Sequence, residues 1–410
     1  MAFLKLAVIG GSSYYTPGLI EALNESDLRV ELVLNGRSKE KLTQVTEVCQ
    51  NLAQKEIDIS MTTDLKKALD GADFVLLQVR IGGMEKRGED ESFPKQFNLV
   101  GEETILPGGA SLAVRTLPYL EEFSKTLLEV SPNAKVMALT NPNNMVIDYF
   151  NRYLGIDAIG FCDLPTSLIR GVVEAFTGEK KGIEEIWPEI SFKYYGINHL
   201  AFLGDINYKN KEIDIVSIAP KLGLDPLLVE TLGLLPVSYL RYYYSTSSVL
   251  EIAKDSPTRG EVLAKQEETL KEDYQKAAGK KPQSLSKRPV PWYKDVVVPY
   301  LKASLTKGEM ILVTQNKGAL ADLQDDSVAE LPVIIKRGKI HRLYQGCMPP
   351  VIKGLVVSVS ESERLIVDGI AKRSPKIFRQ GLIAHPLIRE YKKAEAVMEE
   401  IKRIDKVKWL

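Results

Sequence analysis

A cysteine and a histidine are the residues whose types best suit chemistry around a metal ion. Cys162 lies in Gly160-Phe-Cys-Asp-Leu-Pro165, and His199 lies in Asn198-His-Leu200. One thiolate and one imidazole are too few for a structural zinc site. They could form half of an open catalytic site that water and substrate oxygens complete. The alternative interpretation is that Cys162 is inert packing and His199 a hydrogen-bonded core residue.

A tyrosine-rich segment, residues 236–244, is the candidate source of a base. It contains Tyr239 and Tyr242, and Arg259 follows downstream in Ser256-Pro-Thr-Arg-Gly260. A phenol with a pKa of about 10 is a poor base in water, although a neighbouring cation or metal would lower that value. Tyrosines at this density are ordinarily packing aromatics, so both interpretations stay open.

A glycine-rich turn follows the first apolar run of the chain. Residues 6–9 are followed by Gly10, Gly11, Ser12 and Ser13, and a helical pattern begins at Pro17. Glycines let the backbone approach a pyrophosphate, and free amides at the helix start can hold its charge. The third glycine of G-x-G-x-x-G is missing, so an ordinary strand-to-helix turn is an equal alternative.

The end of the second apolar run departs from the usual dinucleotide pattern. An acidic residue commonly binds the adenosine ribose there, whereas this chain has Asn35-Gly36-Arg37-Ser38. Arg37 and Ser38 could instead receive the 2′-phosphate of NADP. The alternative is a solvated turn in which Asn35 binds the ribose, so the choice between NAD and NADP stays open.

Charged residues and glycines are crowded after two further apolar runs. Residues 80–91 run from Arg80 to Glu91, residues 101–109 follow, and Thr140-Asn141-Pro142 ends another run. A charge run is usually a solvated face, and Asn-Pro is usually a turn. At the carboxyl end of a sheet, however, these groups could hold an anionic, hydroxylated ligand.

The elements that must position these residues alternate between strand and helix over the first third of the chain. We predict strands at 4–9, 30–34, 74–79 and 136–139 and helices at 17–23 and 39–54, a pattern typical of parallel βαβ units. Beyond residue 163 the rhythm lapses, with an alternating strand at 190–195 and a solvated helix and loop at 265–287. The sequence predicts an α/β fold with a Rossmann-type dinucleotide-binding domain at 1–165 and an α+β domain for substrate, metal and oligomerisation at 166–410.

Composition excludes several classes of partner. The 410 residues contain 54 lysines plus arginines and 54 aspartates plus glutamates, so no net field favours nucleic acid or an anionic membrane. No signal-peptide pattern opens the sequence, and no run reaches the roughly 18 apolar residues of a membrane helix. Three cysteines suit a reducing compartment, and three histidines exclude a metal site that needs several of them. We expect a cytoplasmic enzyme.

Taken in order, these segments resemble glycoside hydrolase family 4, the NAD- and manganese-dependent glycosidases, and its phospho-β-glucosidase branch in particular. The similarity runs through most of the chain. It rests on Gly10-Gly-Ser12 with Tyr15-Thr-Pro17, residues 80–91 and 101–109, Asn141-Pro142, the Cys162 segment, Asn198-His-Leu200, the Tyr239 segment and Asn316-Lys-Gly318.

The resemblance implies chemistry outside the two-carboxylate rule for glycosidases. Hydride passes from carbon 3 of the sugar to the oxidised cofactor, and the ketone acidifies the proton on carbon 2. A base removes that proton, the aglycone leaves from carbon 1, water adds, and the hydride returns. The cofactor is needed but not consumed.

The resemblance also assigns roles residue by residue. Cys162 and His199 match ligands of Mn²⁺ or another divalent metal, which polarises the oxygens on carbons 2 and 3. Tyr239 matches the base, with Tyr242 as second choice, and Glu103 matches the acidic position that raises the basicity of this tyrosine. Substrate-binding positions match Arg87, Asn141 and Arg259, since a guanidinium suits phosphate.

Two departures bear on specificity. Asp163 stands where phospho-β-glucosidases usually have asparagine, and an aspartate there resembles the α-specific members, in which it protonates the leaving oxygen. The preferred anomer therefore stays open. Arg288-Pro289-Val290 replaces an Arg-Gly-Gly segment and alters part of the outer pocket.

The predicted function is hydrolysis of 6-phospho-β-glucosides, with 6-phospho-α-glucosides or unphosphorylated sugars as alternatives. A 2-hydroxy-acid dehydrogenase is a second alternative, because lactate and malate dehydrogenases share the expected fold, but His199 lacks the sequence setting of those enzymes. A non-catalytic NAD(P)-binding protein is a third, against which the joint presence of Cys162, His199 and Tyr239 argues. We expect a homodimer or homotetramer, by analogy.

Overall fold

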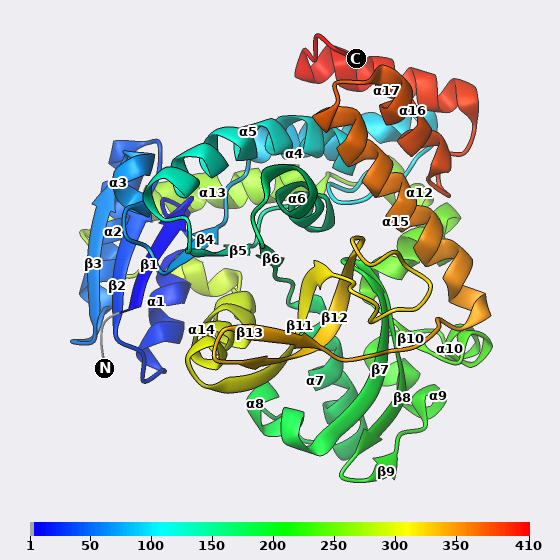
Figure 1. Cartoon of the computed structure of the whole chain (residues 1–410), viewed down its shortest axis with the longest axis horizontal. Helices are drawn as coiled ribbons and strands as arrows, with labels where there is room; N and C mark the ends of the chain where they lie inside the picture. Colours follow the sequence, from blue (N-terminus) through cyan, green and yellow to red (C-terminus); the bar gives the residue numbers. More distant parts are fainter. Residues whose placement is uncertain (1–3) are drawn as a thin grey trace.

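The computed structural model describes residues 4–410, which form a nine-stranded sheet and a smaller four-stranded sheet. Figure 1 shows the large sheet crossing the molecule from β3 to the strands near its centre, with the smaller sheet below them. No helix within residues 4–410 is long and apolar enough to cross a membrane.

The N-terminal part of the large sheet is parallel and doubly wound. Its order is β3-β2-β1-β4-β5-β6, the arrangement of dinucleotide-binding folds, as the strand pairing shows. The strands are β1 (Leu4–Ile9), β2 (Val30–Asn35), β3 (Ile57–Thr62), β4 (Phe74–Leu77), β5 (Lys135–Ala138) and β6 (Ile159–Gly160). The strand order reverses between β1 and β4, so ligands are expected outside the carboxyl ends of these two strands.

Three antiparallel strands extend the same sheet. Residue Val313 of β11 (Lys307–Gln315) pairs with Gly160 of β6, and β12 (Val328–Lys336) and β13 (Lys339–Arg342) follow. The C-terminal half of the chain therefore completes the sheet begun by the N-terminal half. The division at residue 165 stays a prediction.

Alternation along the strands separates two cores. In β1, Leu6 and Val8 face one core while Ala7 and Ile9 face the other, as the period of two dictates. The first core includes side chains of α1 (Pro17–Asn24), α2 (Lys39–Leu52), α7 (Leu164–Thr177) and α14 (Val298–Leu305). The second includes those of α3 (Leu65–Leu69), α5 (Gly108–Val130), α6 (Asn143–Tyr149), α15 (Pro350–Ala371), α16 (Pro375–Ala384) and α17 (Tyr391–Asp405). Figure 1 shows α5, α15, α16 and α17 together on one side of the molecule.

The smaller sheet is built around a hairpin. Strands β7 (Ile190–Ile197) and β8 (Leu200–Tyr208) pair antiparallel, and β10 (Leu235–Pro236) and β9 (Lys211–Glu212) flank β8. Because Ile197 pairs with Leu200, the hairpin loop consists of Asn198 and His199 alone.

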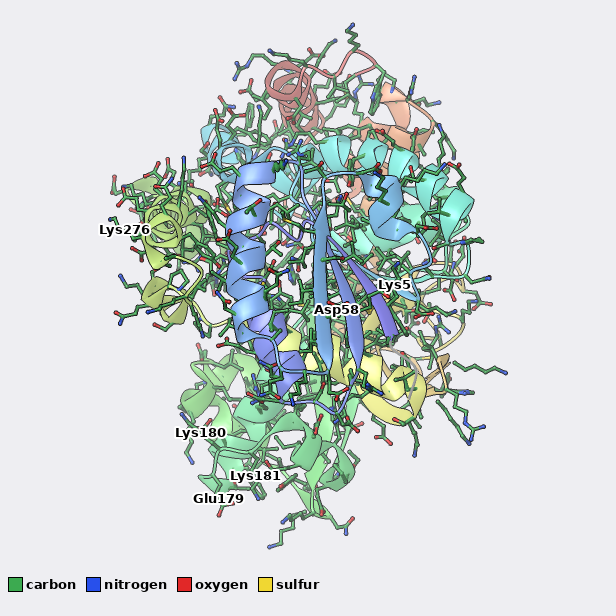
Figure 2. All side chains as sticks on the ribbon, turned by 90° about the vertical axis from the view of Figure 1, so that its left-hand side faces the viewer. Lys5, Asp58, Glu179, Lys180, Lys181 and Lys276 are labelled. Carbon is green, nitrogen blue, oxygen red and sulfur yellow. The ribbon has the colours of Figure 1, made fainter. Side chains whose placement is uncertain are left out.

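The remaining helices follow the chain around these sheets. The predicted solvated helix is α13 (Arg259–Ala277), which buries Leu263, Leu270 and Tyr274 and turns charged side chains outward, as Lys276 shows in Figure 2. The other helices are α4 (Gly83–Ser92), α8 (Ile183–Ile186), α9 (Ile215–Ile218), α10 (Pro226–Leu232), α11 (Arg241–Tyr244) and α12 (Thr246–Lys254).

Candidate active site

The predicted site residues follow the carboxyl ends of neighbouring parallel strands. Asn35 ends β2, Gly10 follows β1, Arg80 follows β4, Asn141 follows β5 and Cys162 follows β6. These strands are adjacent in the sheet, so one edge carries all five positions. The topology thus brings together segments that the sequence analysis could only treat one by one.

The turn after β1 is held by its own backbone. Gly10 has a φ of +91°, and a Cβ there would lie 2.8 Å from the carbonyl oxygen of Gln78, so only glycine fits without strain. The amides of Gly10 and Gly11 both donate to the carbonyl oxygen of Asn35, at 3.1 and 2.7 Å. The amide of Ser12, in the same turn, donates no hydrogen bond to any residue that the structure describes. The amides of Gly10 and Gly11 are therefore already used, whereas that of Ser12 is available. The amides expected to be free at the start of α1 are also used, since Gly18 and Leu19 donate to the carbonyls of Tyr15 and Thr16.

At the end of β2, two of the three predicted ribose contacts have structural partners. The side-chain amide of Asn35 donates to the carbonyl of Thr62 on β3 at 3.0 Å. Ser38 is the N-cap of α2 and accepts from the amide of Lys41 at 3.3 Å. Arg37 is exposed and forms no ion pair within residues 4–410, which leaves its guanidinium free for an anion.

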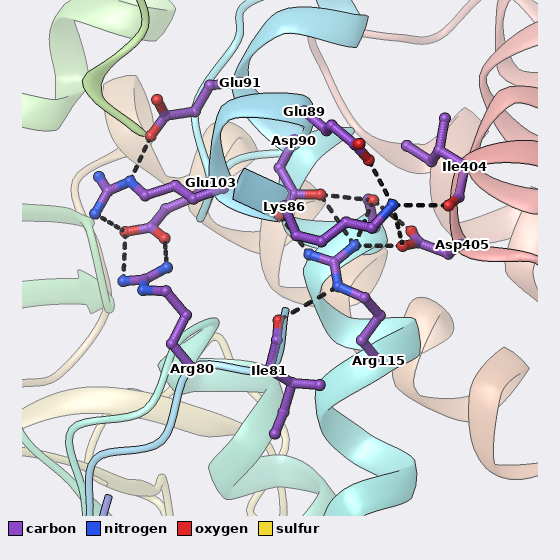
Figure 3. A network of polar contacts seen from close by, with 12 residues as sticks. Arg80, Ile81, Lys86, Glu89, Asp90, Glu91, Glu103, Arg115, Ile404 and Asp405 are labelled. Carbon is purple, nitrogen blue, oxygen red and sulfur yellow. Dashed lines mark hydrogen bonds and ion pairs between the residues drawn. The ribbon is translucent and has the colours of Figure 1, made fainter. Parts of the chain in front are cut away.

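A buried carboxylate joins two arginines at the carboxyl edge of the sheet. Glu103 is 4% exposed and binds Arg80 through both oxygens and Arg87 at 3.0 Å (Figure 3). Burial opposes ionisation of Glu103, but the charges of Arg80 and Arg87 outweigh it and hold its pKa below the ordinary value. Glu103 is therefore an anion at neutral pH, and its charge mainly stabilises these two arginines.

The same network reaches the start of α13. Arg87 also donates to Glu91 at 2.8 Å, and Glu91 accepts the backbone amide of Gly260 at 2.6 Å. Gly260 follows Arg259, so the fold brings two predicted substrate-binding residues, Arg87 and Arg259, to one place. Arg259 itself is exposed and has no ion pair in the described part of the chain.

A second network anchors the helix that carries Arg87. Asp90 of α4, Arg115 of α5 and Asp405 of α17 meet, with Arg115 bonds of 2.5 Å to Asp90 and 2.7 Å to Asp405 (Figure 3). Ser111 lies 2.7 Å from both carboxylates. These residues come from three helices, and no local sequence pattern predicted that they meet. They fix the orientation of α4.

His199 lies in the hairpin loop with an unusual backbone. Its φ is +64°, whereas the second position of such a turn is normally glycine or asparagine. Strain of this kind is typical of functional sites. Burial lowers the pKa of His199 to about 4, against the opposing charge of Glu103. The imidazole is therefore neutral at pH 7, the form that binds metals.

Cys162 and Tyr239 meet His199 from other parts of the chain. The ring of Tyr239 stacks on the His199 ring, with centroids 4.2 Å apart and planes at 26°. Asn198, the neighbour of His199, lies close enough to Cys162 to lower the pKa of its thiol, against the larger effect of burial. Burial, then the charges of Glu330 and Asp163, raise the pKa of Cys162 well above its ordinary value. Residues 162, 199 and 239 thus form one cluster.

The donor set fits a divalent cation bound from one side. No group of three or more metal-binding side chains occurs within residues 4–410, so Cys162 and His199 would share the cation with water and substrate oxygens. The thiol is protonated in the metal-free protein, and a bound cation favours its thiolate. A soft thiolate with a neutral imidazole suits a transition metal rather than Mg²⁺ or Ca²⁺.

The two candidate bases differ in their surroundings. Tyr239 stacks on His199, whereas the hydroxyl of Tyr242 accepts a bond of 3.0 Å from Arg241. Burial, then Glu102 and Glu103, raise the pKa of Tyr239. The effect of Glu103 on this tyrosine has the sign expected from the sequence, since a higher pKa means a stronger base once the proton has left.

Asp163 and Asn141 complete the set. Asp163 occupies the N-cap position of α7 next to Cys162, but its side chain makes no capping hydrogen bond. Burial raises the pKa of Asp163 against the charges of Arg170 and Arg288. Arg288 lies over the ring of Tyr15 at 4.7 Å, so it links Asp163 with the turn after β1. Asn141 is half-buried and makes no side-chain hydrogen bond to the other predicted residues.

Glu330, Glu102 and Thr104 were not predicted as site residues from the sequence. Glu330, 2% exposed on β12, accepts hydrogen bonds from Tyr194 at 2.6 Å and from Asn198 at 3.0 Å. Burial raises its pKa to about 7. The sequence feature that could have identified Glu330 is a lone carboxylate inside an otherwise apolar strand. Glu102 and Thr104 flank Glu103 and were hidden within the charged segment.

Comparison with solved structures defines the class of fold. Malate dehydrogenase of Cryptosporidium parvum superposes with a TM-score of 0.54 at 14% identity, covering 90% of this chain and 100% of that one. A likeness this distant is one of fold alone. It confirms the predicted α/β fold of the lactate and malate dehydrogenase type.

Family models then place the chain more narrowly. Residues 5–177 match the Family 4 glycosyl hydrolase model, and residues 194–388 match the Family 4 glycosyl hydrolase C-terminal domain. The chain belongs to glycoside hydrolase family 4. The resemblance drawn from the sequence motifs is thereby confirmed.

Some relatives are named 6-phospho-beta-glucosidases, and others are named 6-phospho-alpha-glucosidases. The 6-phospho-beta-glucosidase BglT of Thermotoga maritima is 29% identical over 413 residues, 97% of each chain. A structure of the Thermotoga maritima enzyme with manganese, NAD⁺ and glucose-6-phosphate superposes with a TM-score of 0.90 at 28% identity, covering 98% of both chains. The 6-phospho-alpha-glucosidase of Leptotrichia buccalis is 24% identical over 444 residues, 100% of this chain and 99% of that one.

Proposed function

We propose that this chain hydrolyses 6-phospho-β-glucosides with NAD and a divalent metal, Mn²⁺ by preference. The observation that carries the proposal is the meeting of Cys162, His199 and Tyr239, which lie far apart in the sequence, at one end of a dinucleotide-binding sheet. The 6-phospho-beta-glucosidase BglT and the related structure with manganese, NAD⁺ and glucose-6-phosphate support it.

Cys162 and His199 would hold the metal, and the turn at Gly10–Ser13 would hold the dinucleotide. When bound, the dinucleotide would supply hydride transfer at carbon 3, and the metal would supply Lewis-acid polarisation of the oxygens on carbons 2 and 3. Tyr239 removes the proton from carbon 2 through its phenolic oxygen, which the cation's charge brings toward ionisation. The stack against His199 keeps the phenol beside the metal ligand.

Arg87 and Arg259 would bind different parts of the substrate. Arg87 already binds Glu91 and Glu103, so its role is to orient sugar hydroxyls within a fixed network. Arg259 has no ion pair in residues 4–410, and its guanidinium is therefore the better candidate for the 6-phosphate. Asn141, at the end of β5 between Arg80 and Cys162, would donate to a sugar hydroxyl.

The alternative substrate is a 6-phospho-α-glucoside, which one observation favours. The carboxyl of Asp163 adjoins Cys162, and burial raises its pKa, as suits a group that protonates a leaving oxygen. We propose a cytoplasmic location, because a phosphorylated sugar does not diffuse across a membrane, and a homodimer or homotetramer.

A panel of nitrophenyl 6-phosphoglycosides tests this function. Both anomers, and the same glycosides without phosphate, are assayed with Mn²⁺, a reductant and either NAD or NADP. We expect the phosphorylated β anomer to be cleaved fastest, with no net NADH. Turnover of the α anomer alone would assign the other specificity. Comparable turnover without phosphate would contradict the assignment of Arg259, and net NADH from a hydroxy acid would contradict the glycosidase.

A further inference from the structure

Thr104 lies between a buried carboxylate and the predicted metal ligand His199. Its hydroxyl oxygen is 2.6 Å from Oε2 of Glu102 and 2.8 Å from Nδ1 of His199. Glu102 and Thr104 are 5% and 7% exposed. Glu103, between them in sequence, turns the other way to Arg80 and Arg87. Two adjacent glutamates therefore serve different partners.

The direction of each hydrogen bond follows from the contacts. The backbone amide of Thr104 lies 2.6 Å from the same Oε2 of Glu102, and because an amide N–H can only donate, Oε2 is an acceptor. Burial and then the charge of Glu103 raise the pKa of Glu102 to about 7, and above that pH the carboxylate has no proton to give. The Thr104 hydroxyl then donates its single proton to Oε2. Its oxygen then faces Nδ1 of His199 as an acceptor, so Nδ1 must carry the ring proton.

We propose that Thr104 and Glu102 are positioning residues that hold His199 as the Nδ1–H tautomer and so present the lone pair of Nε2 to the divalent cation. The inference rests on the proposed function for the presence of that cation. An outer partner that fixes the tautomer of a metal-binding histidine typically changes metal affinity 10–100-fold when it is removed. The stack of Tyr239 on the ring opposes a flip that would exchange the nitrogens.

Four substitutions separate this role from a merely structural one. Thr104→Val removes the hydroxyl without changing the shape, and Thr104→Ser keeps it. Glu102→Gln keeps an oxygen that accepts from the hydroxyl. Glu102→Leu removes that acceptor, so the freed hydroxyl donates to Nδ1 and forces the proton onto Nε2. Thr116→Val is the matched control, because Thr116 is fully buried on α5 and its hydroxyl has no hydrogen-bond partner.

The tautomer is measured directly by solid-state NMR of the metal-free, full-length protein, kept at a pH above the pKa of Glu102. The protein is labelled with ¹⁵N in its three histidines, and His199→Gln assigns the signals. Mn²⁺ affinity is read by electron paramagnetic resonance of the free ion. We expect Nδ1–H in the parent, T104S, E102Q and T116V. We expect Nε2–H in E102L, a shift toward it in T104V, and Mn²⁺ binding about 10–100-fold weaker in both.

Two outcomes would overturn the inference alone: an Nε2–H tautomer in a parent that binds Mn²⁺, or parent-like Mn²⁺ affinity in folded T104V and E102L. A parent that binds no Mn²⁺ would overturn the proposed function and this inference together. Neither readout depends on turnover. Failure of the substrate panel with the expected tautomer and affinities would therefore count against the substrate alone.

Discussion

The nucleotide end and the sugar end of the site, both at the carboxyl edge of the large sheet, are built differently. At the nucleotide end, after β1 and β2, the contacts are made by backbone groups, as in the bonds from Gly10 and Gly11 to Asn35. At the sugar end, after β4 and β6, buried side chains contact one another, as Glu103 does with Arg80 and Arg87. The first end depends on backbone conformation, and the second on charge and ligand chemistry. Substitutions should therefore have different consequences at the two ends.

The largest effect is expected from Cys162→Ser at the sugar end. Loss of the thiolate removes a metal ligand, and a metal contributes several kcal/mol of charge stabilisation, so turnover should fall about 10³-fold or more. Chelation of the metal from the parent should have the same effect, and added Mn²⁺ should restore only the parent. Thermal unfolding should stay near that of the parent. Undiminished activity of the variant with Mn²⁺ would contradict the ligand assignment.

Glu103→Gln should lower stability because it leaves two arginines without their shared anion. Removing one partner of a buried ion pair costs about 3–5 kcal/mol, which urea unfolding measures at pH 7. Glu251→Gln is the control, since the exposed pair of Glu251 with Lys254 should contribute less than about 1 kcal/mol. Equal losses in the two variants would show that burial of the Glu103 network has no energetic consequence.

The same pair predicts a pH dependence. The pKa of Glu103 is lower in the folded protein than in the unfolded chain, so the unfolded chain takes up a proton first as pH falls. Its stabilisation is present above the unfolded value of about 4.3 and is lost as pH falls through the folded pKa. The parent should therefore lose more stability than E103Q on acidification. Parallel curves would contradict this assignment.

Gly10→Ala tests the nucleotide end, at the turn after β1. A Cβ there would meet the Gln78 carbonyl at 2.8 Å, adding about 1–3 kcal/mol of crowding to the penalty for a positive φ. Gly71→Ala is the control, because Gly71 has a φ of +65° but open space around it, and should lose only about 1 kcal/mol. Denaturant unfolding and NAD titration compare them. A G10A variant no worse than G71A would show that the close approach does not matter.

The smallest effect is expected from Arg37→Ala. An exposed cation contributes up to about 1 kcal/mol to binding a phosphate, so NADP affinity should fall about fivefold while NAD affinity stays unchanged. Lys39→Ala, at an exposed neighbouring position, should change neither. An equal loss of affinity for NADP and NAD in the variant would show that Arg37 does not bind the 2′-phosphate.

The nucleotide end could be predicted from the sequence better than the sugar end. Apolar runs and a glycine turn are local patterns, so β1, β2 and the turn at Gly10 were found within a residue or two. The contact of Thr104 with His199 spans 95 residues, and that of Glu330 with Asn198 spans 132. No local pattern encodes such pairs, because they exist only once the sheets have packed.

The partners of individual groups were equally hidden. The side chains of Asn35 and Ser38 were predicted to bind ribose or phosphate, yet the fold gives them Thr62 and the amide of Lys41. A residue type shows what a group can bind, but only the packed chain shows whether that group is still free.

The central claim is that one cation is held by the sulfur of Cys162 and the Nε2 of His199. X-ray absorption at the manganese edge, on the full-length protein loaded with Mn²⁺, tests it most directly. The account predicts one sulfur and one imidazole among mainly oxygen neighbours, with the sulfur absent in C162S. A spectrum of oxygen neighbours only, identical in the parent and in C162S, would contradict it.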